Sequence, residues 1–237
     1  MEALGKFRIS HSYIYLLSAP VLLSIYYYHN TEAQFLQLFP SMASDENAGL
    51  YMQYWKFIIF FILTGLLPFC YLIFFVKKPL AEFGLGFGNY KLGLKIIGVL
   101  TPFVILPMIW VAAQMPDIRQ EYPMARILFY KSDLFWQYEL VYVLLYYIAW
   151  EFFFRGFLLF GLAKEFGIIH AILIQTISSC LIHLGKPEGE TLGSILTGIV
   201  FGYIAIRTKS IWYVWILHFT IGVLTDYFVL KQMGVRF

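Results

Sequence analysis

A small set of ionisable residues lies inside long apolar stretches of this sequence. They are Glu151, Arg155, His183, His218 and Asp226. A charged side chain at the centre of a bilayer costs about 2.5–3.5 kcal/mol on the insertion scale, so each of them needs a partner or a function. Glu151 and Arg155 are four residues apart and share one helical face, where they can form an ion pair. One interpretation of this pair is therefore structural, as a contact that holds helices together.

Glu151, His183 and His218 together suggest a hydrolytic site. A carboxylate and an imidazole from different helices can hold and deprotonate a water molecule, while a second imidazole stabilises the developing oxyanion. The same three residues could instead bind a divalent metal such as zinc with one open position. The His-Glu-x-x-His spacing of zinc proteases is absent, so we predict that no cofactor is required. Asp226 is expected to make a polar contact near the end of its helix, and Glu139 to reach water at an interface.

The amino-acid composition indicates whether these residues are surrounded by water or by lipid. The chain has 237 residues, of which 60% are hydrophobic and 13% charged. Soluble domains have about 45–50% apolar and about 25% charged residues, so this chain predicts an all-α, polytopic transmembrane bundle that contacts membrane lipids. The net charge of +3 is scattered among the loops and gives no indication of nucleic-acid binding.

A helical span needs about 20 mostly apolar residues, and the sequence predicts seven to eight of them. The candidate spans are 11–28, 55–76, 92–113, 134–162, 167–184, 192–207 and 210–230. The fourth is longer than one crossing requires, so it must tilt, extend beyond the bilayer or break near Gly156 and hide an eighth crossing. The polar stretches between spans are too short for a soluble domain. We therefore predict a single transmembrane domain over residues 1–237.

Basic residues near the span ends predict the orientation. Lys6 and Arg8 precede the first span, the loop 29–54 contains no Lys or Arg, and several lysines flank the segment 77–91. By the positive-inside rule the N-terminus is expected in the cytoplasm. The segment 77–91 mixes apolar, glycine and basic residues, which predicts that it lies on the membrane surface. In the sixth span, a ladder of small residues predicts close packing inside the bundle (Ser194, Gly198 and Gly202).

The stretch Trp150-Glu-Phe-Phe-Phe-Arg-Gly156 resembles the first motif of the CAAX protease and bacteriocin-processing family, which includes the CAAX prenyl endopeptidase and bacterial Abi-type membrane proteins. That motif is Glu-Glu-x-x-x-Arg, typically followed by Gly, and Glu151, Arg155 and Gly156 match its later positions. His183 falls where the second motif has its histidine, and His218 looks like the histidine of the third motif. The resemblance covers residues from about 77 to 230.

The resemblance implies an intramembrane endopeptidase with a water-filled cavity, acting on a membrane-embedded or lipidated peptide. By analogy with bacterial members, the membrane is a bacterial inner membrane. In the family, the motif carboxylate and the second-motif histidine activate water, and the last histidine holds the oxyanion with an asparagine four residues on. The arginine orients the paired glutamates. The implied catalytic residues here are Glu151, Arg155, His183 and His218.

The sequence departs from the family pattern at three positions. Trp150 replaces the first glutamate of the pair, Ser179 replaces the aromatic residue expected four positions before His183, and Gly222 replaces the asparagine expected four positions after His218. Pairing with a guanidinium also weakens a carboxylate as a base. These departures favour a second hypothesis, in which the protein is a catalytically impaired family member that acts as a membrane-embedded binding, immunity or assembly subunit.

Two further points bear on the site. Glu188 or Glu190, in the loop after His183, could fold back and supply the missing carboxylate, or could simply be solvated. Straight spans at about 1.5 Å per residue would place His183 near the opposite surface from Glu151. A third hypothesis, a small transporter with a Glu/His proton relay, would require paired discontinuous helices that the sequence does not contain.

Overall fold

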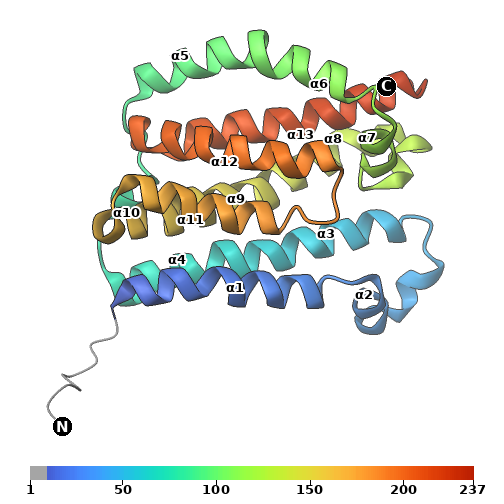
Figure 1. Cartoon of the computed structure of the whole chain (residues 1–237). Helices are drawn as coiled ribbons and strands as arrows, with labels where there is room; N and C mark the ends of the chain where they lie inside the picture. Colours follow the sequence, from blue (N-terminus) through green and yellow to red (C-terminus); the bar gives the residue numbers. More distant parts are fainter. Residues whose placement is uncertain (1–9) are drawn as a thin grey trace, which may run out of the picture.

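The computed structural model describes residues 10–237, and every regular element in that range is helical. The predicted all-α bundle is confirmed, with the long helices running alongside one another (Figure 1). The main helices are α1 (His11–His29), α2 (Glu32–Leu38), α3 (Ala48–Phe60), α4 (Leu67–Tyr71), α5 (Tyr90–Leu100), α6 (Leu106–Ala112), α7 (Pro116–Glu121), α8 (Phe135–Val141), α9 (Ile148–Glu151), α10 (Gly161–Phe166), α11 (Ile168–Leu181), α12 (Glu188–Thr208) and α13 (Trp212–Gln232).

Several of these helices join end to end into longer rods. π-helical segments connect α3 to α4, α5 to α6, and α8 through α9 to α10. Five rods are long and apolar enough to cross a membrane: Ala48–Val76, Tyr90–Ala112, Ser132–Phe166, Glu188–Thr208 and Trp212–Gln232. α1 and the shorter apolar helix α11 lie where the two other spans were predicted. Each of the seven predicted spans therefore coincides with a helix.

The rod Ser132–Phe166 does not break at Gly156, and the chain turns back only at Gly167. Gly167 has φ +80°, a conformation that a residue with a side chain adopts only with strain. Glu151 lies 16 residues before this turn and His183 lies 16 residues after it. At about 1.5 Å per residue, the two residues therefore lie at a similar depth. The expectation that they lie near opposite surfaces is wrong, because the rod runs on to Phe166 before it turns.

The segment after Val76 is more than a surface element. Phe83 is buried, the N–H of Ile211 donates to the carbonyl of Gly84 at 2.9 Å, and Glu82 is paired with Lys164. A Cβ atom at Gly156 would lie 3.0 Å from the carbonyl oxygen of Phe83. Gly156 therefore allows this segment to approach the rod that carries Glu151.

The small-residue ladder of α12 packs against α11, as predicted. A Cβ atom at Gly198 would lie 2.8 Å from the methyl group of Thr176. The amide of Gln175 donates to the carbonyl of Gly198 at 2.8 Å, and a Cβ atom at Gly202 would lie 3.1 Å from the same amide. The ladder thus brings the backbone of α12 close to the buried polar side chains of α11.

The two ends of the bundle differ in charge. The start of α1, the segment between α4 and α5, the turn between α10 and α11 and the turn between α12 and α13 lie at one end (Figure 1). Within the described residues, this end carries many basic side chains and the two acids Glu82 and Glu165. At the other end, near α7, Lys131 is paired with Glu46 at 2.6 Å and Lys186 with Glu121. The predicted contribution of Lys6 and Arg8 lies outside the described residues.

Candidate active site

A cavity of about 840 Å³ penetrates the bundle from the end near α7. Its wall is mostly aromatic and aliphatic, and it also includes polar side chains of the candidate site, although not Glu151. Arg155, His183 and His218 contribute to this wall, together with Trp150 and Glu190. An apolar cavity with a few convergent polar groups is the usual form of a binding or active site.

Glu151 lies just behind the cavity wall, where it is 0% exposed. Its Oε1 atom accepts hydrogen bonds from Nη1 of Arg155 at 3.1 Å and from Nδ1 of His218 at 2.5 Å. Its Oε2 atom has no hydrogen-bond partner among the described residues. Glu151 is absent from the residues that line the cavity, so it meets the cavity through His218 and Arg155. A carboxylate in this position orients an imidazole and stabilises its protonated form.

His218 extends from α13 with one ring nitrogen bound to Glu151. Since Nδ1 donates to a carboxylate, the other nitrogen, Nε2, is the atom available to a molecule in the cavity. Aromatic rings hold the imidazole in place, with centroids 4.8 Å away for Tyr147, 5.8 Å for Trp150 and 5.9 Å for Phe201.

His183 lies in the turn that follows α11. Its Nδ1 atom is 2.7 Å from the carbonyl oxygen of Ser179, which accepts and cannot donate, so Nδ1 carries the proton. Nε2 of His183 is therefore a hydrogen-bond acceptor.

The ring of Trp150 lies against both histidines. Its centroid is 5.2 Å from that of His183 and 5.8 Å from that of His218. The indole thus occupies the place between the two imidazoles where the family motif has a glutamate. It also supplies the aromatic contact to His183 that Ser179 cannot make.

The position of the missing asparagine is filled by a tyrosine. A Cβ atom at Gly222 would lie 1.8 Å from the hydroxyl oxygen of Tyr147, so a side chain at 222 and the Tyr147 ring exclude each other. Tyr147 and Gly222 both line the cavity, and Tyr147 packs against His218. Sequence analysis missed Tyr147, because only the packing of α13 against the rod Ser132–Phe166 reveals it.

Glu190 lines the cavity, whereas Glu188 is exposed to solvent and lies outside the wall. Oε1 of Glu190 accepts a hydrogen bond from the hydroxyl of Tyr122 at 2.7 Å, and Oε2 has no partner in the described part of the chain. The next residue, Thr191, donates its hydroxyl to the carbonyl of His183 at 2.8 Å. This bond ties the start of α12 to the turn that holds His183, and it brings a carboxylate to the histidine side of the cavity.

The site residues do not fit the metal alternative. Among residues 10–237, no three His, Cys, Asp or Glu side chains come together as a metal site requires. Nδ1 of His218 and Oε1 of Glu151 are bonded to each other, and Nδ1 of His183 is bonded to a carbonyl. These three atoms are therefore engaged in hydrogen bonds, whereas Nε2 of both histidines is not.

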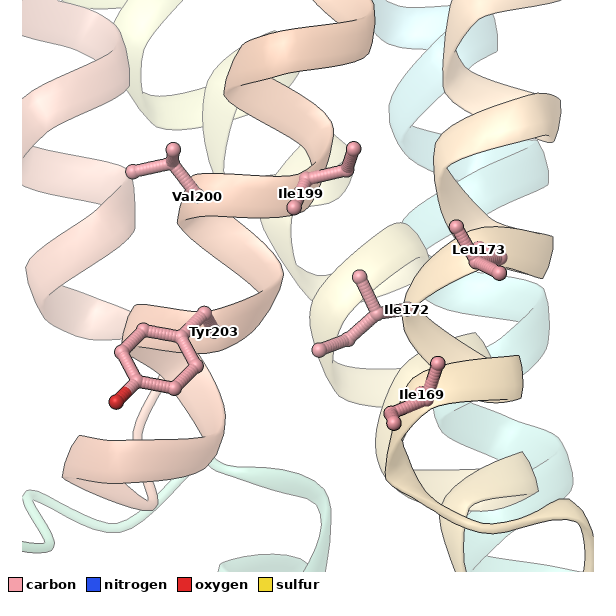
Figure 2. A pocket seen from close by; sticks show the side chains of 6 residues that line it. All are labelled: Ile169, Ile172, Leu173, Ile199, Val200 and Tyr203. Atoms are coloured by element: carbon pink, nitrogen blue, oxygen red, sulfur yellow. The ribbon is translucent and has the colours of Figure 1, made fainter.

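A second hollow, of about 330 Å³, lies between α11 and α12 (Figure 2). Five aliphatic side chains and Tyr203 form its walls, and it contains no acid, base or nucleophile suited to catalysis. The larger cavity therefore remains the candidate site.

The fold and this cavity define an integral membrane protein with buried acid–base groups inside its helical bundle. Residues 132–224 match the family described as type II CAAX prenyl endopeptidase Rce1-like, which confirms the resemblance recognised in the sequence. The matched stretch includes Glu151, Arg155, His183 and His218 and ends near Gly222. No curated protein and no solved structure matched the chain.

Proposed function

We propose that the protein is an intramembrane endopeptidase of the CAAX type, which hydrolyses a peptide bond in a membrane-embedded or lipidated substrate. The observation that carries this proposal is the hydrogen bond between Glu151 and His218 behind a wall that also contains His183. A carboxylate-backed imidazole beside a second imidazole is suited to removing a proton from water. The family match supports this activity at the level of the class.

In the proposed reaction, Nε2 of His218 and Nε2 of His183 both accept hydrogen bonds from one water molecule. The water oxygen attacks the substrate carbonyl carbon while its proton passes to His218, and the C–N bond then breaks as this proton moves to the leaving amine. Glu151 is a positioning residue that stabilises the protonated His218, and Arg155 balances the buried charge of Glu151. This role differs from direct water activation by Glu151, because Glu151 reaches the cavity only through its partners.

Three further side chains have proposed roles. The Tyr147 hydroxyl, which occupies the space beside Gly222, is a donor for the oxyanion in place of the missing asparagine. Glu190, which lines the same cavity as His183 and has one oxygen without a partner in the described part of the chain, supplies the second carboxylate of the site. Trp150, which replaces the first motif glutamate, orients the two imidazoles through ring contacts.

We further propose that the protein resides in a bacterial inner membrane with its N-terminus in the cytoplasm. Basic side chains outnumber acidic ones at the end of the bundle where α1 begins. The positive-inside rule places this end in the cytoplasm. The cavity extends to the opposite end, so the substrate reaches it from the outer side of the membrane.

The test is cleavage of a panel of lipidated and unlipidated membrane peptides by the purified protein. His218→Asn and His183→Asn should each reduce the rate by about 10²–10⁴-fold, the usual contribution of an acid–base group. Glu190→Gln should also slow cleavage, whereas the exposed neighbour Glu188→Gln should not. Retention of full activity in both histidine variants, with wild-type thermal stability, would refute the proposed mechanism.

One observation favours the alternative of a binding, immunity or assembly subunit without protease activity. The buried Trp150 ring fills the position of the usual base between the two histidines. In that case the wild-type protein would cleave no peptide of the panel, and the biological function would survive Glu151→Ala and His183→Ala. Loss of that function in both variants, together with loss of cleavage, would support the protease.

A further inference from the structure

The hollow between α11 and α12 is a groove that shares no lining residue with the large cavity. One face of each helix forms it, with three residues from α11 and three from α12 (Ile169, Ile172, Leu173, Ile199, Val200 and Tyr203; Figure 2). Ile172 is 8% exposed and forms the floor, whereas the other five are 37–71% exposed and form the rims. In a membrane, an exposed groove of apolar side chains is in contact with lipid acyl chains.

The floor of the groove belongs to the packed contact between the two helices. A Cβ atom at Gly202 would lie 3.3 Å from Cγ1 of Ile172, so the glycine allows the Ile172 side chain to lie against the backbone of α12. The floor is therefore held by helix packing, and the groove above it is a fixed feature of this surface.

A cation is held at the edge of the groove. Nη1 of Arg207 donates a hydrogen bond to the hydroxyl of Tyr203 at 2.5 Å, and the guanidinium carbon lies 5.5 Å from the centroid of the Tyr203 ring. Tyr203 thus forms part of the groove wall and also positions the guanidinium. A guanidinium stacked on an aromatic ring is preorganised for two parallel hydrogen bonds to a phosphate group.

Arg207 makes no ion pair with an acid among residues 10–237. The two described acids at this end of the bundle have other partners. Glu82 is paired with Lys164, and Glu165 accepts hydrogen bonds from two serines at the start of α1. A guanidinium has five N–H donors, and the bond to Tyr203 uses one of them. Donors of Arg207 are therefore available to an anion from outside the protein.

The groove and the cation are arranged in the order that a phospholipid requires. Ile169 is the second residue of α11, and Arg207 is the residue before the end of α12, so both lie beside the turns at the basic end of the bundle (Figure 1). At the end of a membrane helix, an arginine lies at the level of the lipid headgroups. The groove begins at this level and continues along the helices towards the interior of the membrane.

We propose that this groove binds one anionic phospholipid, with an acyl chain between α11 and α12 and the phosphate group at the guanidinium of Arg207. Lipid tails are as apolar as the groove walls, so the groove supplies shape and Arg207 supplies the preference for a negative headgroup. Lys209, which is also exposed, adds positive charge two residues further on. The lipid braces the two helices that flank His183, although the proposal does not depend on any catalytic activity.

Native mass spectrometry of the purified full-length protein tests this proposal. Phosphatidylglycerol, which is anionic, and phosphatidylcholine, which is zwitterionic, are added separately to the protein in detergent at equal concentrations. The wild type should retain one phosphatidylglycerol in preference to phosphatidylcholine. Arg207→Gln should reduce this preference about fivefold, the effect of one cation near the membrane surface. Lys78→Gln, which removes an exposed lysine after α4 at the same end of the bundle, should leave the preference unchanged.

The apolar part of the site has its own variants. Leu173→Trp should reduce the retention of both lipids, because the larger side chain would occupy the groove. Ile177→Trp is the control, since Ile177 is exposed one turn further along α11 and lies outside the groove. Thermal unfolding without added lipid shows whether each variant is folded. Added phosphatidylglycerol should raise the unfolding midpoint of the wild type more than that of Arg207→Gln.

Three outcomes would overturn the proposal. Equal retention of the two lipids by the wild type would mean that the groove holds bulk lipid only. An unchanged preference in Arg207→Gln would show that the headgroup does not bind at this guanidinium. A dimer that is present in the wild type and absent in Leu173→Trp would assign the groove to a second copy of the chain.

Discussion

At the residue scale, the positions that depart from the family pattern are matched by neighbours that occupy the same space. Trp150 contacts both histidines, and the Tyr147 hydroxyl fills the volume beside Gly222. Ser179 keeps its contact to His183 through its backbone carbonyl, so that contact does not depend on the side chain. The three substitutions therefore form parts of a coherent packing arrangement around the histidines.

The exclusion between residue 222 and Tyr147 leads to a test of this arrangement. Gly222→Ala should destabilise the protein by about 1–3 kcal/mol, because the new methyl group would overlap the Tyr147 hydroxyl. In a background with Tyr147→Leu, the same substitution should cost less, with a coupling energy of about 0.5–3 kcal/mol in a double-mutant cycle of thermal unfolding. Gly98→Ala, where nothing lies within 4 Å of the added Cβ, is the control. Strictly additive effects would show that the two residues are not in contact.

At the element scale, the hairpin formed by the rod Ser132–Phe166 and α11 is what brings the motifs together. Gly167 in a left-handed conformation ends the rod, and α11 returns beside it so that Glu151 and His183 lie level. α12 then packs on α11 through its glycines, which places Glu190 on the histidine side of the cavity. The cavity thus depends on the distance between α11 and α12.

Gly198→Ala tests this dependence. Its Cβ atom would lie 2.8 Å from the methyl group and 2.9 Å from the hydroxyl of Thr176, a buried β-branched residue with little freedom to move. We expect a loss of about 1–3 kcal/mol in thermal stability. Gly193→Ala on the same helix, with nothing within 4 Å, should be neutral or stabilising, since alanine favours a helix. Equal effects of the two substitutions would argue against tight packing at Gly198.

The positions of the helices could be predicted from the sequence, because lipid requires long apolar runs and such runs are a local property of the sequence. The contacts between these helices could not be predicted in this way. Gly167 is a typical residue at a helix end, but its place in the sequence does not reveal that Glu151 and His183 become level. The burial of Glu139, which was expected to reach water, depends on how the loop 113–131 covers the bundle, which no local pattern encodes. The position of Glu190 in the cavity wall similarly depends on long-range contacts, among them its hydrogen bond with Tyr122.

At the scale of the whole molecule, the basic end and the cavity lie at opposite ends of the bundle. The residues at the outer part of the cavity include Asp117 and Glu121 of α7, and the segment 77–89 lies at the far end (Figure 1). If the basic end faces the cytoplasm, a substrate must approach from the outer side of the membrane. The orientation of the bundle thus determines which compartment supplies the substrate.

Cysteine labelling can determine this orientation. In a background with Cys70→Ala and Cys180→Ala, single cysteines are introduced by Ser44→Cys near α3 and by Lys78→Cys after α4, both at exposed positions. A membrane-impermeant maleimide added to intact cells should label Ser44→Cys, whereas Lys78→Cys should react only after permeabilisation. Equal labelling of both variants in detergent is the control for thiol reactivity. The reverse pattern in cells would place the basic end outside and open the cavity to the cytoplasm, which would require a cytoplasmic substrate.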